Sequence, residues 1–210
     1  EYSKALSFYE KELEILRKTL PANHPLLATC FGNMAVLYQH MGEYSKALSF
    51  YEKALEICRK TLPANHPLLA TCFGNMAGVY QHIGEYSKAL SFYEKDLEIC
   101  RKTLPANHPS LATCFGNMAG VYKDMGEYSK ALSFYEKELE IFQKTLPANH
   151  PSLATCFGNT AVLYQHIGEY SKALSFHEKA LEILQKTLPA NHPSLATCFV
   201  NVGGLYRHMG

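Results

Sequence analysis

The 210-residue sequence has no marked excess of charge and no long apolar run. Its 20 Lys and Arg face 19 Asp and Glu, whereas a protein that adheres to nucleic acid over its whole surface is strongly basic. No apolar stretch is long enough to span a bilayer, and no charged-then-apolar leader opens the chain. We therefore expect a soluble protein that binds neither nucleic acid nor membranes. Because the chain begins at Glu1 and not at methionine, we also expect it to be part of a longer protein.

The sequence also lacks the short motifs that carry common catalytic and cofactor chemistry. It contains no glycine-rich phosphate loop, no HExxH and no CxxC. A catalytic site requires a nucleophile, a base and an orienting group in one pocket, and no local pattern brings such groups together. We therefore expect neither an enzyme nor a bound cofactor.

What the sequence does contain is one 42-residue unit written five times without insertion or deletion. The repeats are 1–42, 43–84, 85–126, 127–168 and 169–210. Such a period is typical of an array in which each repeat contacts only its neighbours. The prediction is therefore a single repeat array over residues 1–210.

Each repeat carries two helical patterns joined by the connector LPANHP. Apolar residues recur at steps of three and four in both, as on the core-facing side of an α-helix. In the second repeat they are Tyr44, Ala47, Leu48, Tyr51, Leu55, Cys58 and Leu62, then Leu69, Cys72, Phe73, Met76, Ala77, Val79, Tyr80 and Ile83. Pro63 should end the first helix, and Gly84 should end the second. Connections this short predict antiparallel helices.

The spacing of a further set of residues resembles the tetratricopeptide repeat (TPR), whose helices A and B form a hairpin. The set is Phe73, Met76, Ala77, Tyr80, Gly84, Tyr86, Ala89 and Tyr93. The long helix B and the following KTLPANHP are similar to the 42-residue subtype of kinesin light chains and nephrocystin. This resemblance covers the whole chain and implies an all-α, right-handed superhelical solenoid of ten helices. The chain would begin with a helix B and end with a helix A, with four whole A–B hairpins between residues 25 and 188.

One position departs from the pattern that the resemblance implies. The family places a small residue where helix B meets the next helix A. Ala54 and Ala180 comply, but Glu12, Asp96 and Glu138 do not. Because a buried, unpaired carboxylate is costly, we expect these acids to reach water or a lysine, the alternative being burial.

Cysteine is repeated as well. Five of the seven cysteines share one phase of the repeat, namely Cys30, Cys72, Cys114, Cys156 and Cys198. Equivalent helices in a stack lie about 8–10 Å or more apart, whereas a disulfide requires Cα atoms about 4.4–6.8 Å apart. We expect reduced thiols that fill space in the core, and we infer a reducing, cytoplasmic location.

Histidine recurs in the connector and near the end of helix A. Zinc requires ligand atoms about 2.0–2.3 Å from the ion, and side chains spread along a ladder of repeats rarely meet that demand. We therefore expect no metal site. The connector histidine of each repeat, such as His66, should instead hold the Asn-His-Pro turn.

The resemblance implies that helix A lines a groove that binds a peptide. Thr71, Asn75, Gly78 and His82 lie at i, i+4, i+7 and i+11, on one side of the helix. The predicted groove residues are Thr71, Asn75, Gly78, Gln81 and His82, then Thr113, Asn117, Gly120 and Lys123, then Thr155, Asn159, Gln165 and His166. Lysine, glutamine and histidine there would favour a ligand with some acidic character.

Asparagine and glycine in this groove each have two explanations. A carboxamide offers both a donor and an acceptor to a peptide backbone, yet it can equally bond to a neighbouring helix of the stack. Glycine inside a helix costs about 1 kcal/mol relative to alanine. It would either let another backbone approach closely or be a relic of copying one unit five times.

These patterns predict a protein-interaction scaffold that binds a peptide segment of a partner. The alternative is a structural spacer or a solenoid that associates head to tail, since an array without polar caps exposes its end helices. The residues expected at that contact are Tyr2, Leu6, Tyr9 and Leu13 at the start, and Phe199, Val202 and Tyr206 at the end.

Overall fold

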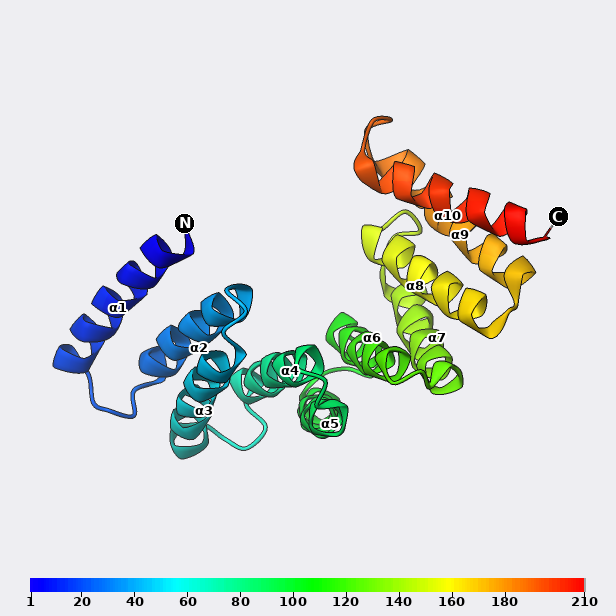
Figure 1. The fold of residues 1–210 in the computed structure, drawn as a ribbon. Helices are drawn as coiled ribbons and strands as arrows, with labels where there is room; N and C mark the ends of the chain where they lie inside the picture. Colours follow the sequence, from blue (N-terminus) through cyan, green and yellow to red (C-terminus); the bar gives the residue numbers. More distant parts are fainter. Residues whose placement is uncertain (210) are drawn as a thin grey trace. The chain divides into compact units, whose positions relative to one another are not determined.

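The computed structural model describes residues 1–209, and within that range the chain forms ten helices and no strand (Figure 1). The helices are α1 (Tyr2–Thr19), α2 (Pro25–His40), α3 (Tyr44–Thr61), α4 (Pro67–His82), α5 (Tyr86–Thr103), α6 (Pro109–Asp124), α7 (Tyr128–Thr145), α8 (Pro151–Ile167), α9 (Tyr170–Thr187) and α10 (Pro193–Met209). The even-numbered helices are the helices A of the sequence pattern, and the odd-numbered ones are the helices B. None of these helices combines the length and apolar character of a membrane-spanning segment.

A histidine caps the start of each helix A. In the second repeat, His66 is the N-cap residue of α4, and its Nδ1 accepts a hydrogen bond from the backbone N–H of Leu68 at 3.2 Å. The other four connector histidines accept the same bond at 3.2–3.3 Å. Pro67 follows at the first helical position, where its missing N–H forfeits no helical hydrogen bond. The prediction that this histidine holds the turn is confirmed.

A glycine in the left-handed region ends each hairpin's helix A. Gly42, Gly84, Gly126 and Gly168 have φ between 75° and 84°, a conformation that glycine adopts without steric cost. In the second repeat, Gly84 N–H donates to Gln81 O at 3.0 Å and Glu85 N–H donates to Tyr80 O at 2.9 Å. This turn satisfies the last carbonyl groups of α4 and directs the chain back along it as α5.

The helices of a hairpin are joined by a recurring aromatic group. Phe50 of α3 lies between Phe31 and Tyr38 of α2, with ring centroids 6.0 and 5.3 Å apart. The equivalent rings in the other hairpins lie 5.3–6.1 Å apart. Helix A contacts helix B in α2–α3, α4–α5, α6–α7 and α8–α9. These are the four whole A–B hairpins predicted between residues 25 and 188.

The chain divides into two compact units, Glu1–Leu104 and Pro105–Gly210. The N-terminal unit contains α1 to α5, and the C-terminal unit contains α6 to α10. Within each unit, a helix B also contacts the helix A that follows it, as in α1–α2 and α3–α4, and in α7–α8 and α9–α10. Hairpins are therefore stacked inside each unit, while the single array over residues 1–210 stays a prediction.

Candidate binding pockets

The predicted groove residues lie on the solvent side of the helices A. On α4, Thr71 and His82 are exposed, while Asn75, Gly78 and Gln81 are half-buried. The equivalent threonines and asparagines of α6 and α8 follow the same pattern. The buried residues of α4, such as Phe73, Met76 and Val79, occupy the other side of the helix. The helical spacing in the sequence thus separates these residues from the buried side of α4, and their role in binding a peptide stays a prediction.

The side chains of the asparagines in this row have no hydrogen-bond partner within the described part of the chain. This holds for Asn33, Asn75, Asn117, Asn159 and Asn201 on the five helices A. Four of them are half-buried, and Asn33 is exposed. Hydrogen bonding between neighbouring helices therefore does not account for them.

The threonines and histidines are more constrained. The hydroxyl group of Thr71 donates to the Pro67 carbonyl at 3.3 Å, a bond within its own helix, so its oxygen can still accept but its proton is in use. The ring of His166 stacks on Tyr128 with centroids 4.8 Å apart. Nδ1 of His82 lies 2.7 Å from the Gly78 carbonyl and donates to it. A role for these histidines in selecting acidic ligands stays a prediction.

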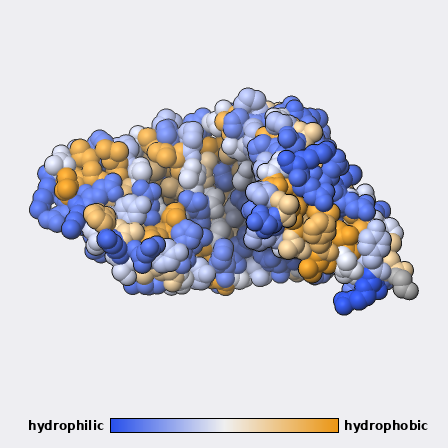
Figure 2. Space-filling view, turned by 90° about the horizontal axis from the view of Figure 1, so that it is seen from above, coloured by the Kyte–Doolittle hydropathy of each residue, from blue (hydrophilic) through white to orange (hydrophobic). Residues whose placement is uncertain are grey.

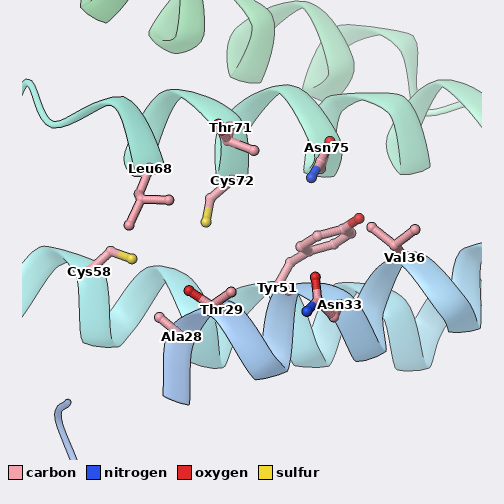
Figure 3. Close-up of a pocket in the computed structure, with 11 residues that line it drawn as sticks. Ala28, Thr29, Asn33, Val36, Tyr51, Cys58, Leu68, Thr71, Cys72 and Asn75 are labelled. Carbon is pink, nitrogen blue, oxygen red and sulfur yellow. The ribbon is translucent and has the colours of Figure 1, made fainter. Parts of the chain in front are cut away.

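In the N-terminal unit, a pocket of about 130 Å³ opens between α2 and α4 (Figure 3). Figure 3 shows Asn33 of α2 and Asn75 of α4 on opposite sides, with the ring of Tyr51 from α3 between them. Tyr51 is 1% exposed, and its hydroxyl group donates to Gln39 Oε1 at 3.4 Å. The wall is open beside Gly32, since a Cβ built there would meet no atom within 4 Å.

Two thiols lie toward one end of this pocket. Cys58 of α3 and Cys72 of α4 both line it, and Figure 3 shows their sulfur atoms on facing helices. Burial and the neighbouring Cys58 thiol raise the pKa of Cys72 to about 12, which keeps the thiol protonated and poorly nucleophilic. All seven cysteines are free, and all except the half-buried Cys72 are buried.

An equivalent pocket of about 350 Å³ lies three repeats later in the C-terminal unit, between α8 and α10. It is lined by Ala154, Thr155, Gly158, Asn159, Val162, His177, Ala180, Leu184, Ser194, Thr197, Cys198 and Asn201. His177 of α9 stands where Tyr51 stands in the first pocket. It is 1% exposed, and its buried Nε2 has no hydrogen-bond partner among residues 1–209. Burial also lowers the pKa of His177, which favours the neutral ring.

Between α6 and α8, the corresponding position is occupied by a carboxylate. Glu138 of α7 replaces the alanine found at 54 and 180. A Cβ built on Gly116 of α6 would lie 2.7 Å from Glu138 Cδ and 2.9 Å from its Oε2. The Cys156 thiol of α8 interacts with the Glu138 carboxyl group and donates a hydrogen bond to the Tyr135 carbonyl at 3.8 Å. The absence of a side chain at Gly116 is thus what gives Glu138 its space.

The expectation that these acids reach water or a lysine is wrong for Glu138. Its Oε2 is buried and has no hydrogen-bond partner in the described chain. Burial raises the pKa of Glu138 to about 7, an effect that the neighbouring Cys156 thiol partly offsets. Glu12, by contrast, is exposed. Asp96 resembles Glu138 in one respect, because a Cβ on Gly74 would lie 2.9 Å from its Oδ2.

The two end helices carry exposed apolar side chains. Tyr2 and Phe8 of α1 are 51% and 63% exposed, and Phe199 and Tyr206 of α10 are 53% and 56% exposed. On the face shown in Figure 2, apolar residues gather in patches separated by hydrophilic ones. Leu6, Tyr9 and Val202 are half-buried. Leu13, which was expected at the same uncovered side, is instead buried, and α1 contacts α2.

Comparisons with known proteins agree with this architecture. The family model described as "Tetratricopeptide repeat" matches residues 1–60, 32–102, 68–144, 111–186 and 158–210. The crystal structure of BtubC (BKLC) from P. vanneervenii is 25% identical, with a TM-score of 0.84, over 99% of this chain and 84% of that one. No curated protein sequence matches the chain.

Two further solved structures are similar. A putative kinesin light chain from Podosopora anserina with nearly identical TPR-like repeats is 29% identical, with a TM-score of 0.75, over 88% of this chain and 87% of that one. The apo form of RapI is 23% identical, with a TM-score of 0.77, over 89% of this chain and 65% of that one, a likeness of fold alone. The predicted fold class, an all-α solenoid of antiparallel helix pairs, is confirmed.

Proposed function

The chain belongs to the tetratricopeptide repeat family, and we propose that it is a scaffold whose helices A bind an extended peptide segment of a partner protein. Repeats of this family generally bind protein partners. The observation that carries the proposal is the row of asparagines without partners, which includes Asn75, Asn117 and Asn159. Each carboxamide matches the donor and acceptor of a peptide group, and the row repeats at the same position of successive helices A.

The pockets beside this row support the same function. Each open pocket is lined by two asparagines and by apolar side chains, and in the first pocket Asn33 and Asn75 lie on either side of the Tyr51 ring. No charged side chain lines either pocket. A peptide whose backbone is held by the carboxamides could place side chains in these spaces, so that affinity arises from many modest contacts. No catalytic arrangement is part of this proposal.

Replacing Asn75, Asn117 and Asn159 together by alanine is expected to weaken peptide binding without destabilising the fold. The peptide would be one selected on the natural chain from a display library of random sequences. A hydrogen bond contributes about 0.5–1.5 kcal/mol net, and three of them about 1.5–4.5 kcal/mol, so we expect a roughly 10- to 1,000-fold rise in Kd. Calorimetry would measure Kd, and circular dichroism would measure helicity and Tm.

The matched control replaces the exposed connector asparagines Asn65, Asn107 and Asn149 by alanine, and it should leave Kd unchanged. If the groove variant binds as tightly as the natural chain, the asparagines do not hold the peptide. A large fall in its Tm would show that they are structural.

We also propose that two copies of the chain associate head to tail. The exposed Phe199 and Tyr206 of one copy and Tyr2 of the next are the observation that favours this second function. Here α10 of one copy would meet α1 of the next as helix A meets helix B in α2–α3. Burial of apolar area contributes about 25 cal/mol per Å² before the cost of association. A contact of this head-to-tail kind builds filaments and not closed rings.

The Val202→Asp variant is expected to abolish concentration-dependent association measured by sedimentation velocity, because it places a charge in that contact. Leu6→Lys should act in the same way from the other end. Val200→Asp is the control, since Val200 is 73% exposed and lies on another side of α10. A natural chain that remains monomeric at millimolar concentration would contradict the proposal.

A further inference from the structure

The space beside Gly116 of α6 holds an acid, whereas the equivalent space in two other repeats is open. Gly32 of α2 and Gly158 of α8 each line an open pocket, and a Cβ built on either would meet no atom within 4 Å. A Cβ built on Gly116 would lie 2.9 Å from Glu138 Oε2. The Glu138 carboxyl group of α7 therefore stands where the other two repeats have an open pocket.

Glu138 has no partner of opposite charge in the described part of the chain. Its Oε2 makes no hydrogen bond there, and no lysine or arginine contributes to the shift of its pKa. The side chain as a whole is half-buried, so it is not sealed from solvent. Acids that are partly removed from water are usually paired with a cation. The ionised form of Glu138 therefore lacks the partner that its surroundings favour.

Two asparagines of the groove flank this acid. In the first pocket, Asn33 and Asn75 lie on either side of the ring from the helix B between them (Figure 3). The same positions two repeats later are Asn117 of α6 and Asn159 of α8, and both helices contact α7. Both asparagines are half-buried, and a carboxamide oxygen accepts hydrogen bonds. Three helices thus bring oxygen acceptors to one place.

We propose that Glu138, with Asn117 and Asn159 beside it, forms a subsite for an arginine side chain of the bound peptide. A guanidinium group matches a carboxylate with two parallel hydrogen bonds and retains further donors for the carboxamide oxygens. The inference rests on the proposed function, because the arginine belongs to the peptide that the asparagines hold. It contrasts with the acidic ligand predicted from the lysine, glutamine and histidine of the groove.

Binding of a cation here should strengthen as pH rises, because only ionised Glu138 pairs with it. The titratable groups beside the carboxyl group are Cys156 of α8 and Tyr135 of α7. Burial and the nearby Glu138 raise the pKa of both, so both stay neutral between pH 6 and 8. On α6, the facing residue is Gly116, which does not titrate. Because the pKa of Glu138 is about 7, its ionised fraction rises roughly tenfold over this range, and Kd should fall by the same factor.

Three small probes separate the possible chemistries: the acetylated amides of arginine, glutamine and glutamate. The full chain, labelled with ¹³C and ¹⁵N, would be titrated at pH 8 while the Glu138 carboxyl carbon is followed by NMR. We expect the arginine probe to shift this signal with a Kd of roughly millimolar order. At ten times Kd, it should lower the pKa of Glu138 by about one unit, because it binds the ionised form. We expect no saturable shift with the glutamine or glutamate probe.

Loss of the acid should remove the site. Glu138→Gln keeps the shape of the side chain and should abolish the shifts that the arginine probe causes at the backbone amides of Asn117 and Asn159. The control is Glu140→Gln, because Glu140 is exposed and paired with Lys144 at 2.6 Å, and it should leave the shifts unchanged. Shifts that persist in Glu138→Gln would overturn the inference. So would the absence of any shift in the natural chain, or equal binding of the glutamine probe.

Transfer of the acid should also transfer the site. Ala180→Glu places a carboxyl group beside Gly158, where the space is open. Circular dichroism would verify that this variant is folded. We expect the arginine probe to shift the backbone amides of Asn159 and Asn201 in this variant, and binding there should strengthen from pH 6 to pH 8. A folded Ala180→Glu chain that gains no such site would contradict the inference.

The probes act without any peptide, so this test fails separately from the proposed function. If a selected peptide binds the natural chain and Glu138→Gln equally well, and the arginine probe does not bind, the inference is wrong and the scaffold function stands. If the arginine probe binds as expected but the variant with alanine at positions 75, 117 and 159 retains full peptide affinity, the subsite is real and the role of the asparagine row is wrong.

Discussion

The stability of Glu138→Gln relative to the natural chain is expected to rise by roughly 3 kcal/mol between pH 4 and pH 8. Burial raises the pKa of Glu138 from 4.5 to about 7, and each pKa unit corresponds to about 1.4 kcal/mol. The folded chain therefore retains this proton up to about pH 7, whereas the unfolded chain releases it near pH 4.5. The natural chain loses stability across that window as pH rises, and the loss is complete above it.

Urea unfolding followed by circular dichroism at several pH values would measure this difference. Glutamine keeps the shape of the side chain but does not ionise. The free energy of unfolding of Glu138→Gln should therefore lack the pH dependence that Glu138 causes. The control is Glu140→Gln on the same helix, because Glu140 is exposed and paired with Lys144 at 2.6 Å. If the free energy of unfolding changed with pH in the same way for the natural chain and for Glu138→Gln, the Glu138 carboxyl group would be solvated and the prediction would be wrong.

Gly116→Ala is expected to expel the Glu138 carboxyl group and to return its pKa from about 7 toward 4.5. The new methyl group would lie 2.7 Å from Glu138 Cδ, and the flexible end of the glutamate yields more readily than the helix backbone. In solvent, the carboxylate regains its hydration, so the pKa shift caused by burial disappears. A ¹³C NMR titration of the Glu138 carboxyl carbon would follow this change.

Gly158→Ala is the matched control for that experiment. It lies one repeat later at the same position of helix A, and a Cβ built there would meet no atom within 4 Å. It should stabilise the C-terminal unit by about 1 kcal/mol through helix propensity alone and leave the Glu138 titration unchanged. A Glu138 pKa that stays near 7 in Gly116→Ala would mean that the carboxyl group does not occupy the space beneath that glycine.

The fold could be predicted because each local signal in the sequence agrees with the others. Pro67, which follows His66, is the first residue of α4, and the left-handed Gly84 lies just after its end. The 42-residue period repeats both signals along the chain. The connector histidine could be assigned to the turn because it follows asparagine and precedes proline in every repeat. These are short-range features, and a chain that repeats them five times repeats the resulting structure.

The roles of the helix B residues that face helix A, such as Glu138 and His177, could not be predicted in the same way. They depend on contacts between residues far apart in sequence. Gly116 accommodates Glu138, but glycine also occurs at 32 and 158, where the facing residue is alanine. The glycine therefore gives no sign of whether an acid lies beneath it. His177 likewise resembles an ordinary exchange of one ring for another until its unpaired Nε2 is seen.

The residue that distinguishes an open pocket from a filled one belongs to helix B and not to the helix that a ligand touches. Alanine at 180 lines an open space, whereas Glu138 fills the equivalent one. Repeats can therefore differ in the space that they offer a ligand through a single substitution on helix B. The solvent-facing row of helix A need not change, but an acid at this position carries the cost in stability that burial imposes on Glu138.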